Sequence, residues 1–308
     1  MRLVFAGTPD VAALSLRALL SSRHEVAAVI TRPDAERGRG RHVARSAVAD
    51  VAHEQGLLLL QPESARSPEF LAELIALEPD CCPVVAYGNL LPAPVLGVPP
   101  RGWVNLHFSL LPAWRGAAPV QSSIRYGDEV TGATTFVLDE GMDTGPILGT
   151  MTERISPTDT SGDLLDRLAR SGADLLVSTL DALEEGTLVP QPQPSEGVSY
   201  APKISVDDAR VRWTQPAVEI DRVIRACTPA PGAWSTVNDD RIKVGPVQLS
   251  EHSTSLAPGQ VQISKSEVLV GTATVPVRLG MVQATGKRPM PAEDWARGLR
   301  LSSDAVFV

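Results

Sequence analysis

The fold is decided in the first thirty residues, where the apolar runs Leu3-Val-Phe-Ala6 and Val26-Ala-Ala-Val-Ile30 flank an Ala- and Leu-rich segment, residues 11–21. Each run is short and continuously apolar, which is typical of a strand buried on both faces of a sheet. The intervening segment has the composition and length of an amphipathic helix. Strand, helix and strand in this order predict a right-handed βαβ unit with parallel strands.

The same alternation continues through the first half of the chain. The predicted strands are residues 3–6, 26–30, 57–60, 84–86 and 104–108, and the predicted helices are residues 11–21, 46–55, 68–77 and 119–126. The fourth strand is expected to begin only after Pro83, because proline lacks an N–H for the ladder. Residues 134–138 and 147–155 are predicted as a hairpin-like pair of strands, followed by a long helix over residues 163–184. This half is therefore expected to be α/β, with a mainly parallel, Rossmann-like sheet.

A different pattern begins after residue 186. Residues 186–197 contain prolines at alternate positions, Pro190, Pro192 and Pro194, which favour an extended, semi-rigid linker. A short helix near residues 217–226 is expected next. Five brief β-type runs then follow at residues 234–237, 242–247, 259–263, 268–271 and 275–282. Short strands separated by Gly and Pro indicate a small antiparallel barrel.

Composition narrows the class of protein. The chain has 308 residues, enough for two domains, and a formal net charge of −8, which argues against nonspecific coating of nucleic acid. Its three cysteines offer neither a disulfide framework nor a CxxC pair, so we expect a reducing, cytoplasmic location and no metal site. No signal peptide and no apolar run of about 18 residues is found, so no membrane partner is expected. The first strand lacks the G-x-G-x-x-G of dinucleotide binding, which excludes a nicotinamide cofactor.

Charge is distributed unevenly along the chain. Residues 206–308 hold 12 Lys and Arg against 11 Asp and Glu, whereas residues 1–205 hold 16 against 25. Within the acidic part, residues 37–45 carry four arginines and no acid: Arg37, Arg39, Arg41 and Arg45. On its own such a run is most often a solvated surface loop. Its position after the strand at residues 26–30 makes it a candidate for binding a polyanion.

The candidate catalytic residues follow the strand at residues 104–108. Asn105 and His107 are two positions apart, so their side chains share one face of the strand. Asp143 lies in a Gly-flanked turn that can fold back towards them. An amide donor, an imidazole and a carboxylate can hold an oxyanion and move a proton without a covalent nucleophile. A lone Asn-x-His pair is more often structural, but ligands collect at the carboxyl ends of strands in open α/β sheets.

Several segments together resemble the methionyl-tRNA formyltransferases, a family of folate-dependent formyltransferases. The segments are residues 5–10 and 85–88, the block from Asn105 through Ser109-Leu-Leu-Pro112 to Pro119, residues 139–145, and residues 200–204. The resemblance implies a formyltransferase catalytic domain over residues 1–188, a linker over 189–205 and a C-terminal OB-like tRNA-binding domain over 206–308. The chain departs from the family pattern at Phe108, where the family usually has a small residue.

The resemblance also implies the reaction and the roles of residues. The formyl group of 10-formyltetrahydrofolate, a cosubstrate, would be transferred to the amino group of initiator methionyl-tRNA, with Asn105, His107 and Asp143 as the catalytic trio. A protonated His107, favoured by Asp143, is expected to donate to the formyl oxyanion together with Asn105, and Asp143 is expected to assist the proton transfer. No metal and no obligate protein partner are implied. The expected folate contacts are Tyr87, Gly88, Asn89, Leu90, Leu91, Ser109, Leu110, Leu111, Pro112, Asp139, Glu140, Gly141 and Gly145. The expected tRNA contacts are Arg37, Arg39, Arg41, Arg45 and Lys203.

Two other classes of function stay open at this point. A formyltransferase acting on glycinamide ribonucleotide or on an amino sugar nucleotide would share the same trio. The C-terminal residues 206–308 count against the first of these, and the arginine run counts against the second. A noncatalytic RNA-binding protein would use the barrel alone, and the complete Asn, His and Asp set counts against it.

Overall fold

The computed structural model describes residues 1–37, 42–250, 256–299 and 305–308. The chain divides into two compact units, each made of several segments. The first unit comprises Met1–Pro119, Val130–Arg154 and Leu165–Tyr200, and the second comprises Val120–Glu129, Ile155–Leu164 and Ala201–Val308. None of the helices in the described part of the chain combines the length and the apolar composition needed to cross a membrane.

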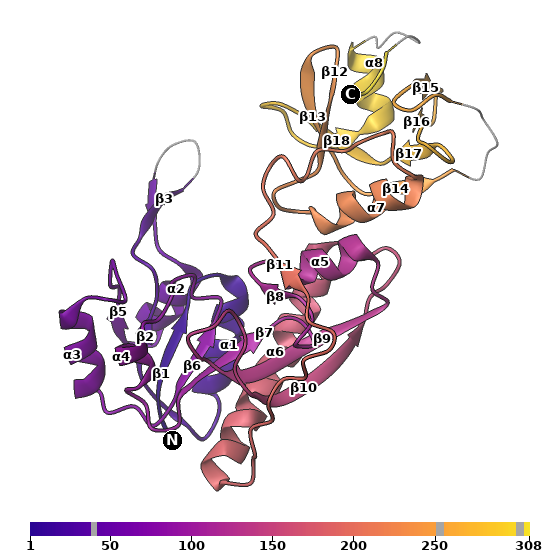
Figure 1. Ribbon diagram of the computed structural model, residues 1–308. Coiled ribbons are helices and arrows are strands. Elements are labelled where there is room, and N and C mark those ends of the chain that lie inside the picture. The colour runs from indigo at the N-terminus through magenta and orange to yellow at the C-terminus, as the bar shows by residue number, and fades with distance from the viewer. Residues whose placement is uncertain (38–41, 251–255, 300–304) are drawn as a thin grey trace. The chain divides into compact units, whose positions relative to one another are not determined.

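A seven-stranded sheet in the order β10-β9-β7-β6-β1-β2-β5 forms the first unit (Figure 1). Its strands are β1 (Arg2–Gly7), β2 (Glu25–Ile30), β5 (Leu58–Leu60), β6 (Cys82–Val85), β7 (Trp103–His107), β9 (Val130–Val137) and β10 (Ile147–Arg154). The first five are parallel, whereas β9 runs antiparallel to both β7 and β10. The predicted mainly parallel, Rossmann-like sheet is confirmed, and so is the hairpin-like pair at its edge.

Helices cover both faces of this sheet. Alternate residues of β1 and β2 (Val4, Ala6, Ala28 and Ile30) share a core with α3 (Pro68–Ala76) and α4 (Ala93–Leu96). On the other face, α1 (Asp10–Leu20) contacts β1, β2 and β6 and packs against α2 (Ala47–Glu54), while α6 (Ser161–Glu185) covers β7 and β9. Serines cap two of these helices: Ser46 accepts from Ala49 N and Ser67 from Phe70 N.

Two local predictions in the first unit need correction, and some short elements were not predicted. β6 begins at Cys82 and includes Pro83, because an N–H missing near the start of a strand removes at most one ladder bond. Arg37 and residues 42–44 of the arginine run lie in paired strands, since β3 (Ala35–Arg37) pairs antiparallel with β4 (His42–Ala44), and residues 38–41 lie outside the described residues. The short helix α4 and the two-residue strands β8 (Arg115–Gly116) and β11 (Tyr200–Ala201), which pair with each other, are too brief to show a period in the sequence.

The second unit is built from two antiparallel sheets around one core, which confirms the predicted antiparallel β architecture. Their orders are β12-β13-β18-β19 and β14-β17-β16-β15. The strands are β12 (Trp234–Val237), β13 (Asp240–Val244), β14 (Val247–Leu249), β15 (Val261–Ile263), β16 (Val268–Val270), β17 (Val277–Leu279), β18 (Met281–Ala284) and β19 (Met290–Pro291). Helices α7 (Ala217–Ala226) and α8 (Ala292–Leu299) contribute Ile220 and Trp295 to the shared core. The sequence had predicted α7 but not α8.

Two of the predicted strands in this unit are each divided between the two sheets. The run over residues 242–247 breaks at Gly245 and Pro246, and the run over residues 275–282 breaks at Gly280. The two breaks lie together: Gly245 donates its N–H to Met281 O at 2.8 Å, and a Cβ on Gly280 would lie 2.6 Å from Pro246 O. Glycine at both positions permits this close crossing, which hydropathy alone does not reveal. α5 (Pro119–Tyr126) begins where the first segment of the first unit ends.

Candidate functional site

A cavity of about 500 Å³ in the first unit gathers most of the predicted side chains. It lies at the carboxyl ends of β6 and β7, beside the turn that follows β9. Its lining residues are Val84, Ala86, Tyr87, Gly88, Asn89, Leu90, Leu91, Leu96, Asn105, Leu106, His107, Phe108, Gly116, Ala117, Pro119, Leu138, Asp139, Glu140, Gly141, Met142 and Asp143. The walls are largely apolar and carry a few convergent polar groups, which is the usual character of a small-molecule site.

Strand β7 positions two members of the predicted trio. Alternation along the strand puts Asn105 and His107 on the same face as Trp103, which packs in the core with α4. Leu106 faces the other way, against Gly172 of α6, where a Cβ would come within 3.2 Å of the leucine. The prediction that Asn105 and His107 share a face is confirmed.

His107 is buried, with 6 % of its surface exposed, and both ring nitrogens have a neighbour. Its Nε2 lies 2.9 Å from Trp114 O. A carbonyl can only accept, so this nitrogen carries the proton and donates it. In the neutral ring Nδ1 is then unprotonated, and it lies 3.6 Å from Asp143 Oδ2. That separation is too long for a hydrogen bond but close enough for a strong charge interaction if the ring gains a proton.

Asp143 is held by its own backbone and by the loop that follows β7. It adopts a φ of 53°, a left-handed conformation that a short polar side chain tolerates. Its Oδ2 accepts a hydrogen bond from Gly116 N at 2.7 Å. The turn after β9 is thereby joined to the loop after β7. As the sequence predicted, the turn folds back on the loop and brings the acid to the histidine.

The pKa of His107 differs from the expectation of a protonated ring. Burial lowers this pKa below the ordinary value of a histidine, while the charge of Asp143 and the hydrogen bond to the Trp114 carbonyl raise it by less. The resting ring is therefore neutral at pH near 7. A neutral ring can accept a proton, and the nearby carboxylate stabilises the cation that results.

Asn105 contributes a free amide to the same cavity. Its side chain is half-buried and lines the pocket. Within the described residues its carboxamide makes no hydrogen bond, so both N–H groups are available to a ligand.

The residues predicted to contact folate fall into two groups. Those that line the cavity are Tyr87, Gly88, Asn89, Leu90, Leu91, Asp139, Glu140 and Gly141. Those that do not line it are Ser109, Leu110, Leu111, Pro112 and Gly145. Ser109 Oγ donates to Ala113 O at 2.6 Å, and Thr134 Oγ1 donates to Ser109 O at 2.7 Å. In this structure Ser109 braces the loop after β7 against β9, and a role in folate binding stays a prediction for all thirteen.

Some lining residues were not anticipated. Leu96, Leu138 and Met142 extend the apolar wall, and Ala86 enters it with a φ of 47° directly after β6. Leu138 and Met142 stand beside predicted residues in the sequence, so that proximity is a usable signal. Leu96 belongs to the short helix α4, which the sequence did not predict. Phe108 also contributes to the lining of the cavity, and its ring lies beside Gly172 of α6, where a Cβ would come within 3.5 Å of it.

The structure describes some, but not all, of the residues predicted to contact tRNA. Arg39 and Arg41 lie outside the described residues, and Arg37 is described only as part of β3. Arg45 is an exposed residue just before α2 in the first unit, and Lys203 is an exposed residue of the second unit. Binding of tRNA by these side chains stays a prediction.

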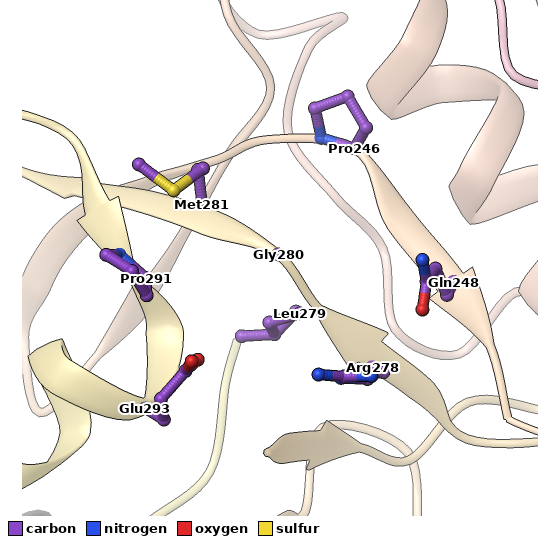
Figure 2. A pocket seen from close by; sticks show the side chains of 8 residues that line it. All are labelled: Pro246, Gln248, Arg278, Leu279, Gly280, Met281, Pro291 and Glu293. Atoms are coloured by element: carbon purple, nitrogen blue, oxygen red, sulfur yellow. The ribbon is translucent and has the colours of Figure 1, made fainter. Parts of the chain in front are cut away.

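Two further cavities belong to the second unit. One of about 500 Å³ is lined in part by Arg210, Arg212 and Arg222 together with Asp207, Asp208 and Glu219. The other, of about 270 Å³, lies where β14, β17 and β18 meet and is shown in Figure 2. It is lined by Pro246, Gln248, Arg278, Leu279, Gly280, Met281, Pro291 and Glu293. Neither contains a histidine, so neither matches the acid–base set of the first unit.

Comparison with known protein families covers both parts of the chain. A family model described as formyl transferase matches residues 1–180, and one described as formyl transferase, C-terminal domain, matches residues 203–300. A methionyl-tRNA formyltransferase of Salinispora arenicola is 60% identical over 307 residues, covering 100% of each chain. One of Thermobifida fusca is 61% identical over 307 residues, covering 100% of this chain and 99% of the relative.

Solved structures with the same fold are more distant in sequence. The sugar 3N-formyl transferase WlaRD has a TM-score of 0.69 at 16% identity and covers 94% of this chain and 99% of its own. HypX of Aquifex aeolicus, solved in complex with tetrahydrofolic acid, has a TM-score of 0.65 at 18% identity and covers 97% of this chain and 47% of its own. At these identities the likeness concerns the fold alone.

Proposed function

This chain belongs to the formyl transferase family, and on that premise we propose that it transfers the formyl group of 10-formyltetrahydrofolate to the amino group of initiator methionyl-tRNA. The observation that carries the proposal is the gathering of Asn105, His107 and Asp143 at one cavity. The whole chain also matches methionyl-tRNA formyltransferases at about 60% identity.

The cavity suits a folate. Its apolar wall, which includes Leu91, Leu96 and Leu138, offers a surface against which a flat heteroaromatic ring can pack, and Leu90 and Met142 are exposed apolar residues among its lining. The carboxamide of Asn105 supplies a donor that has no hydrogen-bond partner in the part of the chain that the structure describes. When bound, the folate provides a formyl carbon attached to N10 as the electrophile.

Asn105 is the residue placed to stabilise charge. Attack of a neutral amine on the formyl carbon turns the formyl oxygen into an oxyanion, which needs donors arranged in advance. The Asn105 carboxamide has both N–H groups free and stands at the wall of an apolar cavity, where such a donor is stronger than in water. Loss of one donor of this kind typically costs about 10²–10³ in turnover.

His107 and Asp143 are the pair placed to move the proton. The amine must lose a proton as the new C–N bond forms, and N10 must gain one as the old C–N bond breaks. The neutral ring of His107, with its lowered pKa and its unprotonated Nδ1, is a suitable acceptor. Asp143 Oδ2, 3.6 Å away, stabilises the imidazolium until the proton passes to the leaving nitrogen. Each proton and electron pair is thereby accounted for without a covalent enzyme intermediate.

An RNA acceptor is supported by the arginine run over residues 37–45. The run that contains Arg37, Arg39, Arg41 and Arg45 has no acidic residue. Arginine binds phosphate through two parallel hydrogen bonds, so clusters of this residue favour a phosphodiester backbone. The relatives with full coverage are named for a tRNA substrate, and both ends of the chain align with them.

The test is a formyl-transfer assay with labelled 10-formyltetrahydrofolate and three acceptors: initiator Met-tRNA, glycinamide ribonucleotide and an amino sugar nucleotide. We expect label to appear on Met-tRNA alone. Transfer to a small acceptor with none to Met-tRNA would reject the proposed acceptor and keep the chemistry. Absence of transfer to every acceptor, by folded protein that binds folate, would reject the catalytic proposal itself.

A further inference from the structure

Residues 191–200, expected from the sequence to form a spacer, are part of the first unit and pack against its other segments. Gln191 exchanges backbone hydrogen bonds with Ile147 at 2.7 and 2.8 Å. Ser199 accepts from Arg115 N at 2.9 Å through its carbonyl and donates its own N–H to Pro112 O at 3.3 Å. Between these anchors, Gln193 is the only half-buried residue in a run, residues 191–198, that is otherwise exposed.

The Gln193 carboxamide joins the two loops that form the catalytic site. Its Oε1 accepts from Arg115 Nε at 3.1 Å and from Arg115 Nη2 at 2.6 Å. Its Nε2 donates to Asp143 O and to Gly145 O, both at 2.8 Å. Both ends of the side chain are therefore satisfied, one by the loop after β7 and the other by the turn after β9.

These contacts lead directly to the trio. Arg115 precedes Gly116, whose N–H holds Asp143 Oδ2, and follows Trp114, whose carbonyl holds His107 Nε2. Ser199 Oγ accepts from Trp114 N at 2.9 Å and fixes the same loop from the other side. The position of the Asp143 carboxylate relative to His107 thus depends on the loop and the turn that Gln193 connects.

We propose that Gln193 is a positioning residue for formyl transfer: by bonding Arg115 and the backbone of Asp143 and Gly145, it holds the carboxylate of Asp143 in register with His107. This inference rests on the proposed function. Pro192 and Pro194 flank the glutamine and restrict its backbone before it binds, which reduces the entropy lost when the contacts form. The segment expected to be a spacer thus helps to position the catalytic residues.

The first test compares Gln193→Ala with Gln191→Ala. Gln191 stands two residues away in the same segment, and among the residues that the structure describes its side chain donates only to Val189 O at 3.2 Å. We expect Gln193→Ala to lower kcat by about 10- to 100-fold while KM for the folate changes by less than about threefold, because misplacement of a catalytic group by about 1 Å costs up to 10² in rate. Gln191→Ala should retain wild-type kcat within about twofold. Equal kcat in the two variants would overturn the proposal.

A second variant separates the two ends of the carboxamide. Gln193→Glu keeps the size of the side chain and an acceptor for Arg115, but it faces two carbonyl oxygens without a donor. We expect its kcat to fall at least as far as that of the alanine variant. Wild-type kcat in Gln193→Glu would show that the bonds to Asp143 and Gly145 have no function.

A third measurement needs no substrate. Because Gly116 N donates to Asp143 Oδ2, exchange of this amide with deuterium reports whether the acid is in place. We expect exchange to become at least about tenfold faster in Gln193→Ala and in Gln193→Glu, and to stay unchanged in Gln191→Ala. Unchanged exchange in the Gln193 variants would overturn the proposal even if the wild-type protein were inactive on Met-tRNA. Failure of the proposed function would appear separately, as inactivity of the wild type.

Discussion

Two histidines of the first unit are buried beside carboxylates, and they differ in what else surrounds them. His107 ends β7 at the carboxyl edge of the sheet, 3.6 Å from Asp143 Oδ2. His24 immediately precedes β2, at the amino end of that strand, and its Nε2 lies 3.3 Å from Asp181 Oδ1. In both, burial is the largest cause of a lowered pKa.

The carboxylates near His24 already form ion pairs with Arg23. Arg23 Nε lies 2.6 Å from Asp181 Oδ1 and 3.3 Å from Glu184 Oε2, and His24 lines none of the three cavities described above. Asp143 instead has one bond from Gly116 N and stands at the wall of the large cavity. A buried histidine and an acid are therefore insufficient to define a reaction site. Access to a cavity and a free donor such as Asn105 distinguish the two places.

Substitution at the cavity should have the largest effect on catalysis. We expect His107→Ala to reduce kcat by about 10³, because a general base typically contributes 10²–10⁴, and Asn105→Ala by about 10²–10³ through loss of an oxyanion donor. Affinity for tRNA should change little. Single-turnover kinetics with Met-tRNA measure both the rate of transfer and the apparent affinity for tRNA. The matched control is His53→Ala, a substitution of an exposed histidine in α2. Near-normal turnover in either variant would remove that residue from the mechanism.

Asp143 should act mainly through His107. Asp143→Asn keeps the side-chain oxygen that accepts from Gly116 N but removes the charge facing His107. We expect a loss of about 10–10² in kcat, and a double variant with His107→Ala that is barely worse than His107→Ala alone. The pH dependence of kcat should move to lower pH in Asp143→Asn, since the charge that raises the His107 pKa is gone. Fully additive losses would show that Asp143 has an independent role.

His24 should affect stability and not turnover. We expect His24→Ala to destabilise the fold by about 1–3 kcal/mol, as removal of a buried, partnered side chain usually does, while kcat at moderate temperature is unchanged. Because the folded-state pKa of His24 lies below the ordinary value of 6.5, the unfolded chain binds the proton more readily. Stability therefore rises with pH through this range and is lost as pH falls below about 6.5. Thermal melts between pH 5.5 and 8 should show a weaker dependence in His24→Ala, and an identical slope would contradict this.

The smallest effect is expected at the arginine run, outside either histidine site. Arg39→Ala, or Arg37 and Arg41 changed together, should raise KM for Met-tRNA a few-fold and leave folate binding unchanged. Each lost phosphate contact should flatten the salt dependence by about one unit of log–log slope. Arg66→Ala, an exposed arginine before α3, is the control. Full activity of the run variants on Met-tRNA across a range of salt would assign the run no part in tRNA binding.

Local patterns were sufficient for much of the fold and for the core of the site. The apolar runs now seen in β1 and β2 are continuous, and in β7 a period of two residues puts Asn105 and His107 on one face whatever the strand packs against. The division of β13 from β14 and of β17 from β18 was missed. It depends on the meeting of Gly245 and Gly280 with chain segments more than thirty residues apart, which hydropathy does not record.

The sequence by itself determined that the chain carries a Rossmann-like sheet, an antiparallel second unit, and an amide, an imidazole and an acid of the types that can hold an oxyanion and move a proton. These properties rest on residue type and near-neighbour spacing. Only the tertiary structure decided the charge of His107, because burial outweighs the nearby carboxylate, and the place of Gln193, because its four bonds join residues up to 78 positions apart. Desolvation and long-range hydrogen bonds depend on how distant segments meet, and no local pattern contains that information.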